Sequence, residues 1–259
     1  MNEPITSRDV QPPLTSSLFN RLTNIFAAPG EVYDEVKASP PSTANWLAPT
    51  LILVAVSWIG VGIIFSQDSV KRQVSDLQAQ AIQKQVEKGK LSKAQAEQVR
   101  ASAEKLGGIA MKVSAAVGPA VGAFVAPFWW GLLLWLVGRY ALKGGFTYMK
   151  VVEVAGLAGM IAVLDAVVRT LLIVAMGNLF ANPGPILLVK DFDSSSTAHS
   201  VLAALNLMTF WELTVKSVGL AKLSGASLGK AAIWVFGLGV AVTAVMIGVG
   251  VAARSVFGG

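Results

Sequence analysis

The chain has 259 residues, of which 54% are hydrophobic and only 14% charged, and its mean hydropathy is +0.61. A soluble domain carries roughly a quarter of its residues as charges, so this composition excludes a water-soluble protein and predicts one that lies in a lipid bilayer. There is no cysteine and one histidine, which excludes disulfides, thiol catalysis and the usual zinc sites. The net charge of +6 is compatible with anionic lipid or nucleic acid, and the hydropathy favours lipid over nucleic acid.

The N-terminal tail, residues 1–45, contains one short amphipathic segment. Ser17 is a plausible N-cap for it. Apolar side chains then follow at the spacing of one helical face. This pattern predicts a short helix on the membrane surface, whose lipid-facing residues would be Leu18, Phe19, Leu22, Ile25 and Phe26.

Five stretches are long and apolar enough to cross the membrane, which requires about 17–25 residues each. The sequence therefore predicts an all-α, polytopic membrane protein with five transmembrane helices. The expected spans are residues 46–65, 113–138, 151–177, 200–221 and 231–253.

The segment between the first two spans, residues 66–112, is rich in Gln, Lys, Glu and Ala and has no proline. Gly89 interrupts it, and Ser92 with Gln95 three residues later forms a capping-box pattern. We expect a soluble helical hairpin that projects from the bilayer, with a first arm that can continue the first span as one long helix.

The distribution of Lys and Arg predicts the orientation of the chain. The short loops on the N-terminal side hold five bases, whereas the loop between spans three and four holds only Lys190. By the positive-inside rule the N-terminus is cytoplasmic and the hairpin extracytoplasmic. The nine bases of residues 66–112 point the other way, although many of them lie far from the span ends.

Two acid–base pairs lie inside predicted spans, where each charge costs at least about 2.5–3.5 kcal/mol at mid-bilayer. They are Asp165 with Arg169 and Glu212 with Lys216, each at i,i+4 spacing on one helical face. Because the two spans are consecutive, we expect one four-charge cluster. Either it neutralises itself and fixes the register of the two helices, or it lines a polar cavity for a proton, ion or small anion. No catalytic, metal-binding or cofactor-binding pattern is present.

Two groups of residues are similar to the Yip (Ypt-interacting-protein) domain family, and in particular to its bacterial members. The first precedes and opens span one: Phe26, Pro29, Glu31, Val32, Tyr33, Trp46 and Pro49. The second covers span four and the start of span five: Leu205, Asn206, Leu207, Phe210, Trp211, Ser217, Val218, Gly219, Leu220, Ser227, Lys230 and Ala231.

The resemblance implies five spans in a bacterial inner membrane, with a cytoplasmic N-terminus. Eukaryotic members of the family are associated with Rab-type GTPases and membrane traffic, and some bacterial members are linked to ABC transporter assemblies. The expected function is therefore a non-enzymatic membrane scaffold or accessory protein. Its partner would be a membrane protein such as an ABC exporter, or a second copy of the chain. The alternative is a small transporter or channel subunit that uses the intramembrane charges.

Overall fold

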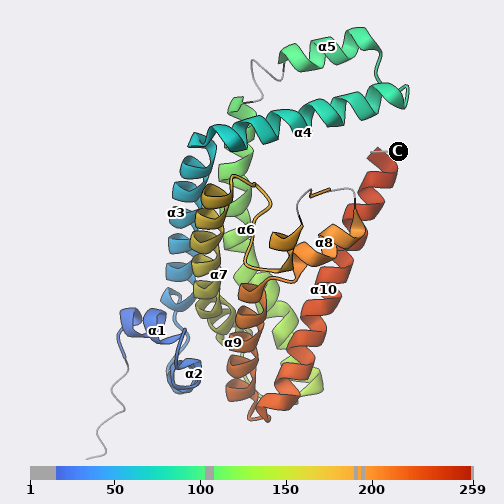
Figure 1. Cartoon of the computed structure of the whole chain (residues 1–259). Helices are drawn as coiled ribbons and strands as arrows, with labels where there is room; N and C mark the ends of the chain where they lie inside the picture. Colours follow the sequence, from blue (N-terminus) through green and yellow to red (C-terminus); the bar gives the residue numbers. More distant parts are fainter. Residues whose placement is uncertain (1–15, 103–107, 190–191, 194–195, 258–259) are drawn as a thin grey trace, which may run out of the picture.

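The computed structural model describes residues 16–102, 108–189, 192–193 and 196–257, and this part of the chain is helical without strands. Long helices run side by side to form a bundle, and two short helices lie at the end near the N-terminus (Figure 1). The helices are α1 (Leu18–Asn24), α2 (Pro29–Ala38), α3 (Ala44–Ser66), α4 (Asp68–Glu87), α5 (Lys93–Ser102), α6 (Gly108–Leu136), the π-helical turn η2 (Val137–Ala141), α7 (Tyr148–Met176), the 3-10 turn η3 (Pro185–Leu188), α8 (Thr197–Ala204), α9 (Leu207–Ser224) and α10 (Leu228–Phe257).

Four helical segments are long and apolar enough to cross a membrane by themselves: Ala44–Ser66, Val113–Ala141, Tyr148–Met176 and Leu228–Ala253. The predicted fourth span is instead divided into α8 and α9, which meet at an angle of 52° and reach the required length and hydropathy only as a pair. The all-α polytopic fold is therefore confirmed, with a break in the fourth span that the sequence analysis did not predict.

Helices α3 and α7 form the centre of the bundle. At Gly156 of α7 an added methyl group would collide with the backbone of Trp46, and at Gly60 of α3 it would lie 2.7 Å from the hydroxyl of Thr170. Both contacts pair positions 110 apart in the sequence, so the two helices run in the same direction and in a fixed register. Residue 55, at the middle of α3, is consequently level with Asp165 of α7.

The hairpin of α4 and α5 turns away from the axis of α3. Gln67 between α3 and α4 is extended, with ψ of 125°, and α4 runs across the end of the bundle (Figure 1). Val70 is fully buried against Ile173, and the side-chain oxygen of Gln73 accepts a hydrogen bond of 2.8 Å from the backbone N–H of Leu179. The first arm of the hairpin therefore does not continue the first span as one long helix, which the sequence allowed, and these contacts hold the first two turns of α4 against the bundle.

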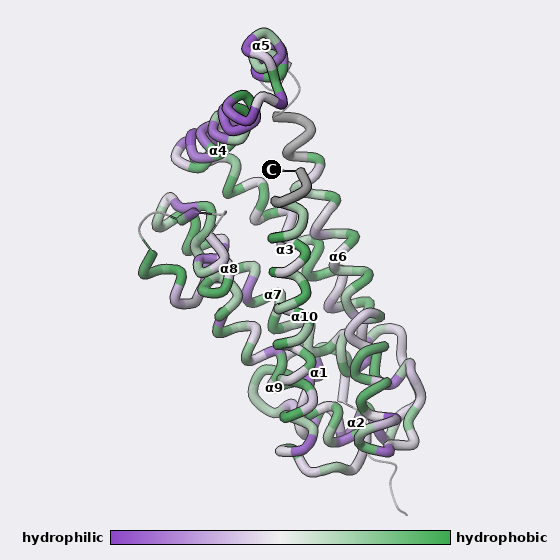
Figure 2. The backbone as a smooth tube through the Cα atoms, turned by 90° about the vertical axis from the view of Figure 1, so that its right-hand side faces the viewer, coloured by the Kyte–Doolittle hydropathy of each residue, from purple (hydrophilic) through white to green (hydrophobic). Residues whose placement is uncertain are grey.

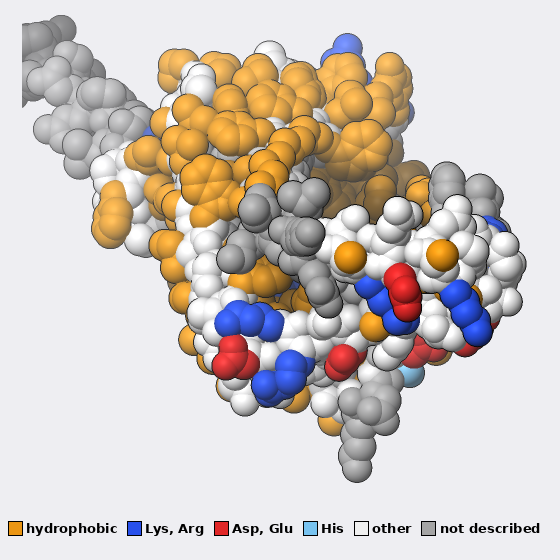
Figure 3. Space-filling model, turned by 90° about the horizontal axis from the view of Figure 1, so that it is seen from above, with side chains coloured by type: hydrophobic (Ala, Val, Ile, Leu, Met, Phe, Trp, Pro, Cys, Tyr) orange, Lys and Arg blue, Asp and Glu red, His pale blue; other side chains and the backbone are white. Residues whose placement is uncertain are grey.

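Within the hairpin the predicted turn is confirmed. Gly89 has a φ of +68°, a conformation that glycine adopts without a steric penalty. Ser92 and Gln95 form the reciprocal capping box at 2.9 and 3.2 Å. The hairpin is the most hydrophilic described part of the chain (Figure 2), and seen from its own end it carries Lys, Arg, Asp and Glu beside a hydrophobic bundle flank (Figure 3).

Helix α10 lies on one side of the bundle and packs mainly against α9, with a smaller contact to α8. Gly239 is the close-contact position, where an added methyl group would meet Leu213. The outward face of α10 is apolar and exposed, including Ile233, Val240 and Met246, as expected for a surface in contact with lipid chains.

Candidate functional site

The first candidate site is the N-terminal segment, α1 and α2, which packs against α3, α7 and α9 at one end of the bundle. Tyr33 is fully buried, and its hydroxyl donates a hydrogen bond of 3.1 Å to the carbonyl of Val154. Gly219 of α9 leaves the space for the Tyr33 ring, since an added methyl group there would lie 3.0 Å from it. Burial, and to a lesser degree the negative charge of Glu212, raises the pKa of Tyr33 well above its ordinary value.

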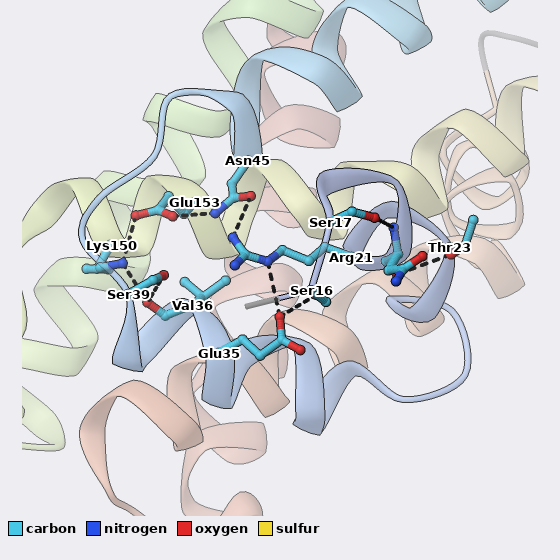
Figure 4. A network of polar contacts seen from close by, with 11 residues as sticks. Ser16, Ser17, Arg21, Thr23, Glu35, Val36, Ser39, Asn45, Lys150 and Glu153 are labelled. Atoms are coloured by element: carbon cyan, nitrogen blue, oxygen red, sulfur yellow. Dashed lines mark hydrogen bonds and ion pairs between the residues drawn. The ribbon is translucent and has the colours of Figure 1, made fainter. Parts of the chain in front are cut away.

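A chain of buried polar groups fastens this segment to the bundle (Figure 4). Arg21 of α1 lies 3.2 Å from the carboxylate of Glu35 and donates a 3.4 Å hydrogen bond to Asn45 Oδ1. Asn45 Nδ2 donates to Glu153 Oε2 at 2.5 Å, and Glu153 Oε1 lies 3.2 Å from Lys150 Nζ. We call these five residues the docking network.

Four of the five residues of the docking network are buried, and the Glu35 side chain is 32% exposed. Glu153 is fully buried, and Arg21, Asn45 and Lys150 are buried as well. Lys150 Nζ also donates a hydrogen bond of 2.5 Å to the backbone carbonyl of Val36, the residue next to Glu35. Buried charges need such partners, because an unpaired charge in a nonpolar interior is strongly unfavourable.

Glu153 lies near the start of the third predicted span, where the sequence favours a carboxylate that anchors the helix at the membrane interface, and the structure buries it instead. The segment α2 covers the position, a tertiary contact that no local pattern shows. The i,i+3 spacing of Lys150 and Glu153 was visible in the sequence and could have suggested a paired site.

One part of the apolar face of α1 packs against the bundle, and the other part is exposed. Ile25 is fully buried in the main core, and Leu22 and Phe26 are half-buried against it. The Phe26 ring meets Trp211 edge to face at 6.0 Å, whereas Phe19 is 71% exposed. Leu18 is also only partly buried. Of the five predicted lipid-facing residues, three therefore contact the bundle, and Phe19 is the one most open to lipid.

The second candidate site is formed by the intramembrane charges, which make two separate pairs. Arg169 lies 3.2 Å from Asp165, and Lys216 lies 2.7 Å from Glu212. Lys216 is almost fully buried, with Nζ 3.9 Å from the centre of the Trp130 ring, a cation–π contact. Within the described residues no hydrogen bond or ion pair connects one pair to the other.

The separation follows from the depths of the two pairs. The side chain of Asn206 donates a 3.0 Å hydrogen bond to Asp165 Oδ1, which places Asn206 near the level of Asp165. Glu212 lies six residues further along α9, and at 1.5 Å per residue it is about 9 Å closer to the N-terminal end of the bundle. The four charges thus occupy two levels of the membrane rather than one.

A small cavity of about 50 Å³ lies beside Glu212, among α3, α6, α7 and α9. Its lining is otherwise mainly apolar and includes Pro49, Pro127, Trp130 and Gly159. This volume suffices for a few ordered water molecules. It is far smaller than the cavities of 300 Å³ or more that hold typical small-molecule ligands.

The break between α8 and α9 is the third candidate site. Asn206 caps α9 by accepting a hydrogen bond of 2.9 Å from the backbone N–H of Met208. The segment that follows α7 folds back to this point, where Pro183 O accepts a 3.0 Å hydrogen bond from the N–H of Leu207 and Asn182 Nδ2 donates to Ala203 O at 3.2 Å. From the sequence alone this segment is expected to be a turn in the loop between spans three and four, followed by a strand-like or interfacial stretch.

In the described residues no three His, Asp or Glu side chains gather closely enough to hold a metal ion. Comparison with family models gives one finding. The model described as "Yip1 domain" matches residues 23–250, which is most of the chain. Neither the curated proteins nor the solved structures give a significant match.

Proposed function

The chain belongs to the Yip1 domain family, and from this premise we propose that it is a non-enzymatic scaffold or accessory subunit of a larger membrane assembly. An ABC exporter is the assembly that the resemblance of the sequence suggests. Two findings support the proposal. The chain belongs to a family of membrane proteins, and in its fold a polar hairpin extends over one end of an apolar bundle.

The observation that carries this proposal is the exposed surface of the hairpin. In the described part of the hairpin, the anchors to the bundle lie at the start of α4, at Val70, Gln73 and Val74. Beyond that point α4 and α5 border a shallow, open groove of about 400 Å³, whose lining includes Gln83, Lys84, Glu87 and Arg100. Two bases against one acid leave this groove with a net positive charge, which suits an acidic partner segment.

We also propose that the chain lies in a bacterial inner membrane, with the end that carries α1 and α2 in the cytoplasm. Arg139, Lys143 and Lys230 are exposed at this end, near the ends of spans. Under the positive-inside rule they favour this orientation, which puts the hairpin on the extracytoplasmic side.

The test is crosslinking in native membranes through a photoreactive amino acid placed at Gln83. We expect one partner to be captured, and we expect the variant Lys84→Gln/Arg100→Gln to reduce its yield at least tenfold. As a matched control, Asp76→Asn/Glu97→Gln changes the same number of hairpin charges while leaving the bases in place.

The control should capture the partner as well as the wild type does. If the base-free variant and the wild type capture the same proteins in the same yield, the hairpin groove is not the docking surface. Folding of each variant is checked by its thermal transition in detergent, which should not move because the altered residues are exposed.

A second function, a small transporter or channel subunit, is favoured by one observation: a span broken beside an ionisable residue. Discontinuous helices with polar groups near mid-membrane form substrate and ion sites in many transporters. Liposomes containing the purified protein would then show a solute or ion flux that Asp165→Asn abolishes. Absence of flux for common ions and solutes would exclude this function in favour of the scaffold.

A further inference from the structure

Two oxygen atoms at the break of the fourth span lack hydrogen-bond donors. The side chain of Asn182 is 96% buried, and its Oδ1 has no partner. The carbonyl of Leu205, the residue that ends α8, accepts no hydrogen bond from the described residues. Both oxygens face Gly184, because an added methyl group there would collide with Leu205 O and lie 3.0 Å from Asn182 Oδ1.

The backbone donors at the same place are satisfied. The N–H of Leu205 reaches Val201 and Leu202, and that of Asn206 reaches Ala204. The next two, from Leu207 and Met208, are bound by Pro183 O and the Asn206 side chain. The break therefore contains acceptor oxygens without donors. A ligand that binds there must be positively charged or must donate hydrogen bonds.

The site lies deep in the membrane. Gly219 of α9 packs against Val154 of α7, and Asn206 lies thirteen residues, about 20 Å, before Gly219, at the N-terminus of α9. Asp165 stands eleven residues, about 17 Å, beyond Val154, which agrees with the hydrogen bond between Asn206 and Asp165. Since Asp165 is level with the middle of α3, the break is close to the middle of the bilayer.

At that depth an acceptor without a donor is unfavourable. Irregular backbone at membrane depth is tolerated only where protein or bound water satisfies its polar groups, because lipid chains cannot. The charge at the site also restricts the ligand. Asp165 is already paired with Arg169, so the surroundings are neutral overall and favour a singly charged ion over a divalent one.

We propose that the break of the fourth span binds a monovalent cation of the Na⁺ class, held by Asn182 Oδ1 and Leu205 O beside Gly184. Carbonyl and amide oxygens are the ligands that hard cations prefer. The C-terminal end of α8 adds the negative end of a helix dipole to the same place. This site is independent of the scaffold function and of any flux, since a cation can bind there and only stabilise the broken span.

The experiment measures equilibrium binding of radioactive Na⁺ to the purified full-length protein in detergent, by scintillation proximity, with choline as the inert cation. We expect saturable binding of about one ion per chain that unlabelled Na⁺ displaces. If the wild type binds no Na⁺ above the choline background, water alone satisfies the two oxygens and the proposal is overturned.

Variants locate the site. Asn182→Leu removes one oxygen, and Gly184→Ala places a methyl group against Leu205 O and displaces it, so each should weaken binding at least tenfold. Gly237→Ala is the control for the second change, because an added methyl group there meets no atom within 4 Å. Asn182→Asp keeps the oxygen and adds a negative charge, although it also removes the Nδ2 donor to Ala203 O; where its thermal transition matches that of the wild type, it should bind Na⁺ at least as tightly.

The Asn182→Asp variant keeps the test decisive if Asn182→Leu fails to fold. Wild-type affinity in a folded Asn182→Leu protein, or loss of binding in a folded Asn182→Asp protein, would each place the cation elsewhere and refute the assignment.

Discussion

The docking network provides the sharpest test of how the N-terminal segment is held. We consider Glu153→Gln, which removes the charge but keeps an oxygen that can accept from Asn45. Lys150 then remains nine-tenths buried with no carboxylate beside it, and its contact with Val36 O is its remaining bond. Removing one member of a buried ion pair costs about 3–5 kcal/mol, because the other charge stays buried and unpaired.

This cost should appear as opening of the N-terminal segment. Since every 1.4 kcal/mol is a factor of ten, the open population should rise between about a hundredfold and a few thousandfold. Trypsin can measure this directly, because the Arg21 side chain is buried and cleavage after it requires α1 to leave the bundle. Lys90, in the exposed turn between α4 and α5, serves as the internal reference, and its cleavage rate should not change.

A double variant separates the ion pair from simple loss of packing. Lys150→Met by itself should also open the segment, since it leaves Glu153 without its base. In Lys150→Met/Glu153→Gln neither charge is left, so the cost should be at least about 2 kcal/mol less than the sum of the single changes. Unchanged protection of Arg21 in Glu153→Gln, or strictly additive costs in the double variant, would refute this reasoning.

Three further predictions concern packing, ionisation and capping. Gly156→Ala should lower the free energy of unfolding by about 2 kcal/mol or more, because the methyl group collides with the backbone of Trp46. The control Gly159→Ala should change it by less than about 0.5 kcal/mol, and denaturant titration of both variants measures the difference. Tyr33 has a raised pKa when folded, so its contribution is present below about pH 10 and is lost as the pH rises toward the folded pKa; tryptic opening should increase in alkali for the wild type and much less for Tyr33→Phe. Ser92→Ala should destabilise the first turn of α5 by about 1 kcal/mol, and faster amide hydrogen exchange confined to the hairpin would confirm it.

Hydrophobic patterning predicted the apolar spans, because the hydropathy of each residue in a spanning helix is a local property, set by its own contact with lipid. The capping box at Ser92 and the turn at Gly89 were predictable for the same reason. The i,i+4 spacing likewise predicted both intramembrane pairs, since the partners share one helix.

The features that were missed depend on contacts between distant segments. Nothing near Gln67 in the sequence shows that α4 turns across the bundle, since the contact that holds it comes from Leu179. The break at Asn206 depends on Pro183 and Asp165, which are brought there by the returning chain and by α7. One four-charge cluster was expected because helical wheels give the face of a residue but not its depth.

The position of α1 and α2 has a consequence for the order in which the protein forms during synthesis. The contact between Lys37 and the carbonyl of Lys222 joins residues 185 positions apart, and Lys222 also pairs with Asp34. At about 5–20 residues per second, the ribosome needs roughly 10–40 s after α2 to deliver this docking surface.

During that interval Tyr33 lacks the cover that Gly219 of α9 provides, even after α7 has been made, although its side chain is fully buried at the end. An amphipathic segment in this position is expected to rest on the membrane surface until α9 has inserted. The surface helix predicted from the sequence then corresponds to the nascent chain. The segment docked on the bundle corresponds to the folded protein.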